Sequence, residues 1–241
     1  MSTFAKSSAL LRNWTHPADE AAELARLAAR LPPLLSVIAG MVDLTGFLLL
    51  GHIFTAHITG NLVLAAAAAV HGDPFNLAQV LAIPAFMLAL AVVWLIAQAS
   101  HRRGAGLARL LLLVQFLLLA AVLILNVITR PSADPSGLTA GIAVMIAVSA
   151  MACQYALLRL AIPGAISTAV MTGNLTNLVL GLIDSTSKRP LLAVDAARLK
   201  RSSQLLLGFL LGCVVAAAAV SALGDWTWSL PLLLSGAAIV L

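Results

Sequence analysis

The chain has 241 residues, of which 61% are hydrophobic and 10% charged, and its mean hydropathy is +1.04. A soluble domain carries about 25% charged and about 45–50% apolar residues, so this composition excludes an ordinary soluble protein and indicates a polytopic membrane protein. The net charge of +5 does not indicate nucleic acid binding, because the basic residues cluster beside apolar stretches. The expected partner is therefore the lipid bilayer.

The N-terminal residues 1–30 are polar and lack the apolar stretch of a secretory signal peptide. The first apolar segment is therefore predicted to be an uncleaved span. Between Thr15 and Arg30, Pro17 is followed by acidic and then by basic residues, which is a helix pattern. We predict a cytoplasmic tail with a short amphipathic helix that lies at the membrane surface.

Eight apolar segments follow the tail. A membrane span needs about 20 apolar residues, and six of the segments qualify, the last of them being short. The two that carry the repeated motif described below are ambiguous, because their parts after Gly60 and Gly173 would cover only about half of a membrane at about 1.5 Å per residue. The segments are 31–51, 55–71, 79–99, 107–129, 137–158, 165–183, 203–223 and 227–241.

The distribution of basic residues favours six spans over eight. With six spans, thirteen of the fourteen Lys and Arg lie on the cytoplasmic side and only Arg130 lies outside. With eight spans, Arg159 and the basic residues of the 100–109 loop move outside, which the positive-inside rule disfavours.

One eight-residue pattern occurs twice, at residues 55–62 and 168–175, which are 113 positions apart. Six of the eight residues are identical, and both copies contain Thr-Gly-Asn. A duplicated half with a helix-breaking motif at matching positions is typical of inverted-repeat transporters. We predict an all-α polytopic membrane protein of about six transmembrane helices plus two broken or re-entrant half-helices. Its single membrane domain, 31–241, would consist of two inverted repeats, 31–129 and 137–241.

Asp43 is the one acidic residue inside an apolar stretch. A carboxylate at that depth costs about 2.5–3.5 kcal/mol on insertion scales, so it is expected to face the bundle interior with a partner or a proton. Two interpretations stay open, a group that couples transport to protons or cations, and a protonated carboxyl hydrogen-bonded to backbone near the motif. Gln154 precedes the second motif at a similar distance and is the expected polar counterpart of Asp43.

The Thr-Gly-Asn motif has a structural and a functional interpretation. Threonine can cap a helix, and glycine allows a bend or a close helix contact. In the functional interpretation, free amides at the start of each half-helix point to the midplane and attract an anion or a polar solute. The predicted binding residues, besides Asp43 and Gln154, are Thr55, Thr59, Gly60, Asn61, Thr168, Thr172, Gly173 and Asn174.

Other polar and small residues have simpler interpretations. His52 and His57 are five positions apart, which is not the spacing of a helical metal pair, and we interpret them as interface histidines. Arg159 is interpreted as a basic anchor on the cytoplasmic side. Gly208 and Gly212 form a Gly-xxx-Gly pair, which predicts a close helix contact.

Signatures of enzymes are missing from the sequence. It contains no HExxH, GxSxG, Walker or dinucleotide-binding motif, and its two cysteines form no CxxC pair. We therefore expect no enzymatic activity, no cofactor, no metal site and no ATP-driven transport by this chain alone.

Four segments resemble the YoaK family, a group of bacterial multipass membrane proteins. They are Gly40-Met41-Val42-Asp43, Phe54 through Leu62, Met151-Ala152-Cys153-Gln154 and Thr168 through Leu175. The resemblance covers about 31 to 223. It implies a single membrane domain of about six helices in the bacterial inner membrane, and it supplies no substrate or reaction.

The sequence departs from the family pattern at three positions. Asn174 stands where threonine is more common, Cys153 stands where glycine is common, and His57 stands where the family tends to an amide or another polar residue. No family role is therefore assigned to His57.

The first functional hypothesis is a small-solute or ion permease in the inner membrane, with the N-terminus in the cytoplasm. Its midplane site would be built from the two Thr-Gly-Asn motifs, and Asp43 would couple transport to protons. The alternative is a non-transporting membrane scaffold or regulatory protein. The sequence does not name the solute, and it leaves open whether copies of the chain form a homo-oligomer.

Overall fold

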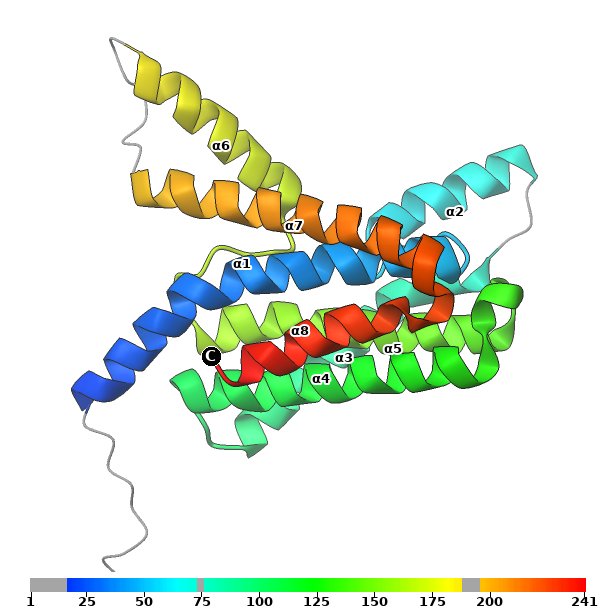
Figure 1. Ribbon diagram of the computed structural model, residues 1–241, viewed down its shortest axis with the longest axis horizontal. Coiled ribbons are helices and arrows are strands. Elements are labelled where there is room, and N and C mark those ends of the chain that lie inside the picture. Colours follow the sequence, from blue (N-terminus) through cyan, green and yellow to red (C-terminus); the bar gives the residue numbers. More distant parts are fainter. Residues whose placement is uncertain (1–16, 73–75, 188–195) are drawn as a thin grey trace, which may run out of the picture.

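The computed structural model describes residues 17–72, 76–187 and 196–241, and in these ranges the chain forms helices joined by loops, without strands (Figure 1). The protein is thus an all-α membrane protein. Its α-helices are α1 (Pro17–Leu49), α2 (Gly60–His71), α3 (Leu77–Ala99), α4 (Gly104–Thr129), α5 (Leu138–Ala161), α6 (Met171–Thr186), α7 (Ala196–Leu223) and α8 (Ser229–Ile239), with two 3₁₀ turns, η1 (Pro131–Ala133) and η2 (Gly224–Trp228).

Five stretches of the described chain are long and apolar enough to cross a membrane. Four of them lie within α1, α3, α4 and α5, and the fifth, Ala196–Ile239, comprises α7, η2 and α8. The chain reverses its direction at η2, so that α8 runs back beside the bundle (Figure 1).

The first helix, α1, includes the segment for which a short surface helix was expected. The amphipathic helix predicted between Thr15 and Arg30 is the first part of α1, which continues through Pro32 and Pro33 to Leu49. The helix is therefore observed, but as the first part of α1 and not as a separate element, and its location at the membrane surface stays a prediction. The helix continues because its apolar side finds protein to pack against: Leu27 and Leu31 are buried in the core, and the Glu23 carboxylate pairs with Arg109 of α4 at 2.5 Å. Prolines inside a helix favour a bend, and the first turns of α1 run at an angle to the rest (Figure 1).

Two helices, α1 and α5, form the centre of the bundle. Helix α1 packs mainly on α7 and also on α8, whereas α5 packs on α4 and α3. The hydrophobic core is rich in side chains from these two helices, and both are buried over most of their apolar length. Figure 1 shows that α1 and α5 run in opposite directions, as do α3 and α7, and α4 and α8.

Close contact between α1 and α7 depends on glycine. A Cβ on Gly40 would collide with the backbone carbonyl of Phe209, and a Cβ on Gly212 would collide with that of Val37. A Cβ on Gly208 would lie 3.0 Å from the carbonyl oxygen of Pro33. The helix contact predicted for the Gly208–Gly212 pair is therefore confirmed.

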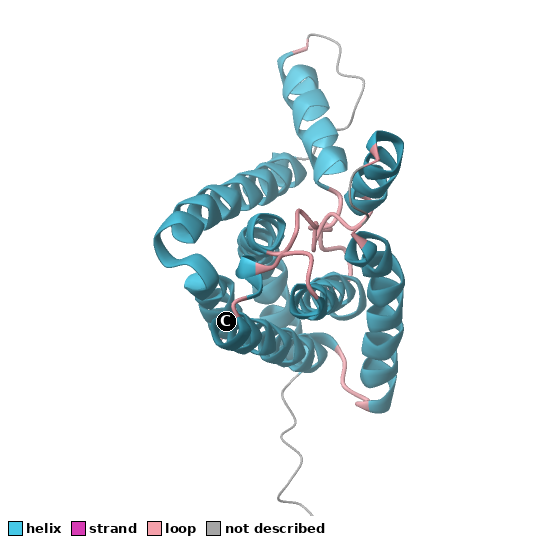
Figure 2. Ribbon diagram, turned by 90° about the vertical axis from the view of Figure 1, so that its right-hand side faces the viewer, coloured by secondary structure: helices cyan, strands magenta, loops and turns pink. Residues whose placement is uncertain are grey.

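The two motif helices, α2 and α6, diverge from the bundle at different ends of it (Figure 1). Helix α2 has the 12 residues expected after the motif glycine, and a left-handed Gly72 ends it. Helix α6 has 16 residues, more than the 11 expected, because it begins at Met171, two residues before Gly173, and continues to Thr186. The loops that precede these helices, 50–59 and 162–170, lie in the interior between the helices (Figure 2).

Candidate functional site

Asp43 closes the first motif loop by accepting hydrogen bonds from its backbone. The residue lies on α1 and is 4% exposed. Its Oδ1 accepts hydrogen bonds from the N–H groups of Thr55 and Ala56, both at 2.8 Å, and from that of His57 at 3.4 Å. Buried N–H groups outside a helix need acceptors, and this carboxylate supplies one for three of them. The partner expected for Asp43 is thus the backbone of the first motif.

His57 completes the contacts of Asp43. Its Nδ1 lies 2.6 Å from Oδ2 of Asp43, and its ring packs edge to face on Phe209 of α7, with centroids 5.1 Å apart. The interpretation as an interface histidine accounts for the contact with α7 but missed the pairing with Asp43. One signal in the sequence points to this pairing, namely that His57 lies within the motif. The pairing itself cannot be predicted from residue spacing, because it depends on how the loop folds over Asp43.

The motif asparagines hold the two loops closed in the same way. Asn61 is fully buried, accepts a hydrogen bond from the backbone N–H of Phe54 and donates one to its carbonyl, both at 2.8 Å. In the second repeat, Asn174 donates to the carbonyl of Ser167 at 3.0 Å. Phe54 and Ser167 are themselves 113 positions apart. The structure thus gives both amides the same structural role, and solute binding by them stays a prediction.

The motif threonines divide into exposed and buried pairs. Thr59 precedes α2 without a capping hydrogen bond from its side chain, and Thr172 lies inside α6, so the capping interpretation is wrong for both. Both are exposed. Thr55 and Thr168 are buried, and their hydroxyls have no hydrogen-bond partner among the described residues.

The motif glycines make room for side chains of the preceding loops. A Cβ on Gly60 would lie 2.9 Å from the ring of Phe54, and a Cβ on Gly173 would lie 2.9 Å from the side chain of Val170. The close contact is thus with the motif's own loop, and the close helix contact expected at these glycines is not observed.

Gln154 connects three helices and is not paired with Asp43. The residue is fully buried on α5. Its Oε1 accepts a hydrogen bond from Nε2 of Gln115 on α4 at 2.8 Å, and its Nε2 donates to the carbonyl of Leu35 on α1 at 2.9 Å. The residue 113 positions after Asp43 is Ala156, two residues after Gln154 on α5. Gln154 is thus not at the position that matches Asp43, although its distance to the motif is similar.

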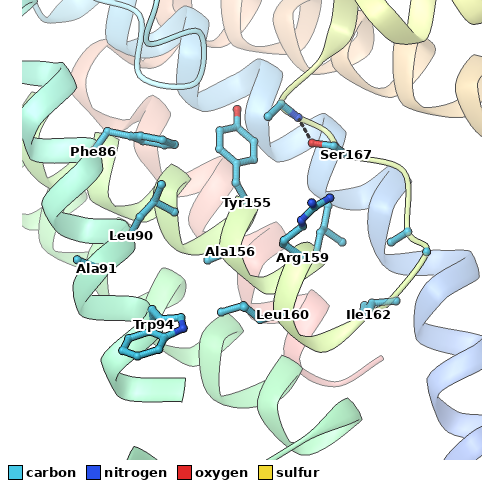
Figure 3. A pocket seen from close by; sticks show the side chains of 14 residues that line it. Phe86, Leu90, Ala91, Trp94, Tyr155, Ala156, Arg159, Leu160, Ile162 and Ser167 are labelled. Atoms are coloured by element: carbon cyan, nitrogen blue, oxygen red, sulfur yellow. Dashed lines mark hydrogen bonds between the residues drawn. The ribbon is translucent and has the colours of Figure 1, made fainter. Parts of the chain in front are cut away.

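A cavity of about 770 Å³ lies between α3, α5 and the second motif loop. Phe86, Leu90 and Trp94 of α3 face it from one side, and Tyr155, Arg159 and Ser167 lie on the other (Figure 3). Tyr155 also donates a hydrogen bond to the carbonyl of Ala56 at 3.0 Å. This tyrosine therefore connects the wall of the cavity with the loop that Asp43 closes. Sequence reasoning missed Tyr155, because nothing in the sequence places α5 beside the first loop.

Comparison with known proteins identifies the family of the chain. The family described as "Protein of unknown function (DUF1275)" matches residues 31–241. The chain belongs to this family. It is also similar to the UPF0700 transmembrane protein YoaK of Bacillus subtilis (strain 168), with 57% identity over 35 residues, which are 14% of this chain and 16% of that protein. No solved structure matches the chain. The resemblance to the YoaK family is confirmed, and the chain is a multipass membrane protein.

Proposed function

We propose that this protein is a permease for a small solute or ion, built from two inverted repeats. The observation that carries the proposal is that both motif loops lie in the interior between the helices (Figure 2) and that Tyr155 contacts the first loop at Ala56 and lines one cavity with Ser167 and Ala169 of the second. Non-helical backbone inside a membrane protein is tolerated where it is buried in protein or lines a water-filled path. Paired broken helices at matching positions of two repeats are the usual place for a transported solute.

The opposed directions of corresponding helices support the inverted-repeat plan. A shift of 113 positions places most of α1 on α5, most of α3 on α7 and the second half of α4 on α8, and each partner runs the other way (Figure 1). The packing follows the same exchange, because α1 contacts α7 and α8 whereas α5 contacts α3 and α4. On this plan α1, α3, α4, α5 and α7 cross the membrane, the 11-residue α8 is the short sixth segment, and α2 and α6 are half-helices that open toward opposite faces.

Asp43, His57 and Tyr155 suit a role in coupling solute movement to proton movement. Asp43 of α1 and His57 of the first motif loop form a pair that can hold a proton, and Tyr155 joins that loop to the cavity. If the loop opened, three N–H groups would lose their acceptor, Oδ1 of Asp43, and the surroundings of the Asp43 carboxylate would change in the same step. We propose Asp43 as the titrating group, with the hydroxyls of Thr55 and Thr168 as solute contacts. No enzymatic step is part of this proposal.

The test uses proteoliposomes that contain the purified full-length chain and a pH-sensitive dye. A panel of neutral, cationic and anionic small solutes is added, and the solute-dependent proton movement is recorded over a range of pH. Asp43→Asn keeps an acceptor oxygen for the loop but removes the titrating carboxyl, so we expect a folded protein without pH-dependent flux. Unchanged flux in that variant, with unchanged thermal stability, would remove Asp43 from the mechanism.

A membrane scaffold is the second candidate function. Helices α2 and α6 contact few other elements and expose large apolar side chains, among them Val63 and Val70 of α2 and Ile183 of α6. Such faces suit contacts with lipid or with other membrane proteins. This candidate predicts that motif substitutions lower stability, whereas no solute in the panel moves faster in the presence of the wild-type chain.

A further inference from the structure

The cavity beside the second motif has a polar end and an apolar body. Among the residues that line it, all of them in the described part of the chain, Arg159 is the only charged one, and no carboxylate is present. Ser167 adds a hydroxyl at the same end, whereas the O–H of Tyr155 beside it is donated to the carbonyl of Ala56. Phe86, Leu90 and Trp94 supply apolar surface opposite them (Figure 3). A guanidinium beside a hydroxyl donor in a largely apolar cavity favours an anionic group on an apolar body.

The two repeats differ at the position where the first one holds its carboxylate. In the first repeat, Asp43 Oδ1 accepts hydrogen bonds from the loop N–H groups. In the second repeat, the matching position is Ala156, which lines the cavity. The second loop is not closed by an acid: the N–H of Ala169 donates to Oγ of Ser167 instead, at 3.1 Å. The Thr168 hydroxyl, on a residue that is 1% exposed, has no partner among the described residues.

The geometry points to a binding site for a small organic carboxylate in this cavity. The carboxylate of the ligand takes the place that Asp43 occupies in the first repeat, beside loop 167–169, and Arg159 neutralises its charge. The apolar body of the ligand lies against Phe86, Leu90 and Trp94. The assignment names a substrate class for the permease proposed above and rests on that proposal for the statement that the bound ligand is transported.

Binding is tested on the full-length chain in phosphatidylcholine nanodiscs by isothermal titration calorimetry with benzoate. Benzamide, which has nearly the same shape without the charge, is the control ligand. Because a charge-assisted hydrogen bond contributes about 1.5–3 kcal/mol, we expect benzamide to bind at least about tenfold more weakly than benzoate. Equal affinity for the two ligands would overturn the assignment.

Two variants place the ligand in the cavity. Arg159→Gln removes the charge from an exposed side chain and should weaken benzoate binding at least about tenfold. Ala156→Asp builds the carboxylate of the first repeat into the second and should block benzoate by occupying its site. The matched control is Arg130→Gln, a basic residue that does not line the cavity, and it should leave the affinity unchanged. Wild-type affinity in Arg159→Gln would overturn the site, provided that all variants melt at the wild-type temperature.

Two further measurements separate the sources of the anion and the two proposals. Titrations in nanodiscs that also contain phosphatidylglycerol should give the same benzoate affinity, and competition by this lipid would overturn the free-solute assignment in favour of a lipid head group. Benzoate binding without any solute flux would overturn the permease and leave the site. Flux that depends on Asp43, together with no benzoate binding, would overturn the site and leave the permease.

Discussion

At the scale of residues, the two asparagines of the motif illustrate how one side chain can hold a loop in shape. Each binds backbone seven positions earlier, and the first forms two hydrogen bonds where the second forms one. An amide suits this task because it carries a donor and an acceptor and can match both groups of one peptide unit. The bond to position 54 or 167 turns the chain back toward the start of the helix that follows.

The difference between the two asparagines predicts a ranking of stability. Asn61→Ala leaves the N–H and the carbonyl of Phe54 without partners in a partly buried site, and we expect a loss of about 2–4 kcal/mol. Asn174→Ala removes a single bond, so we expect about 1–2 kcal/mol. Thermal unfolding of the purified proteins in one detergent measures both. Equal losses, or a larger loss for Asn174→Ala, would contradict the proposed role of the two bonds.

At the same scale, Asp43 binds the first loop through its carboxylate, in the way that a small carboxylate ligand would. Its oxygens face three N–H groups and the ring of His57, and nothing of this kind stands at Ala156. The two loops are therefore alike in their asparagines and different in their charge. This asymmetry is the physical basis for placing a ligand carboxylate in the second repeat.

At the scale of elements, the packing of α1 on α7 depends on the absence of side chains at matching points of the two helices. Gly40 faces the backbone of α7, and Gly212 faces the backbone of α1. Close approach of two helix backbones in a membrane maximises van der Waals contact, which replaces the hydrophobic effect as the force between helices. The same contact places Phe209 against His57, so it also shapes the site.

Alanine substitutions test this contact. Gly40→Ala and Gly212→Ala would each force the two backbones apart, and overpacking of this kind costs about 1–3 kcal/mol. The control is Gly106→Ala in α4, where a Cβ would meet nothing within 4 Å, and where alanine should be neutral or stabilise the helix by up to about 1 kcal/mol. Thermal unfolding compares the three variants, and a result in which Gly106→Ala is the most damaging would refute the packing explanation.

At the scale of the whole molecule, the proposed inverted repeat places the free ends of α2 and α6 on opposite faces of the membrane. Val70, near the end of α2, is 84% exposed, and Ile183, near the end of α6, is 61% exposed. Both positions are therefore accessible to a reagent in water if the adjacent loops leave the bilayer. Eight crossing segments would instead place both ends on one face.

Labelling of single cysteines measures this arrangement. Val70→Cys and Ile183→Cys are made in a background without Cys153 and Cys213, and each is treated with a membrane-impermeant thiol reagent from either side of the membrane. We expect Val70→Cys to react from outside and Ile183→Cys from the cytoplasm, which would also place the N-terminus in the cytoplasm. Reaction of both from the same face would contradict the inverted repeat.

The sequence by itself determined the features that depend on composition and local pattern. The charge content determined the membrane class, the apolar segments located the helices, and the repeated motif located the starts of α2 and α6 to within two residues. The cost of a carboxylate among apolar residues was enough to predict that Asp43 is buried and partnered, and both are observed. The boundary at Arg30 was missed because local charge pattern does not reveal that α4 covers the apolar side of the first turns.

Only the tertiary structure decided which groups meet. Three examples are the pairing of Asp43 with His57, the hydrogen bond from Tyr155 to the first loop, and the cavity at Arg159. Each brings together residues whose distance depends on the path of a loop or on the packing of two helices. Such contacts have no period in the sequence, so neither spacing nor hydropathy can predict them. Gln154 shows the reason, because two positions along α5 turn a side chain by more than half a helical turn, from the cavity wall at Ala156 to the interface with α4 and α1.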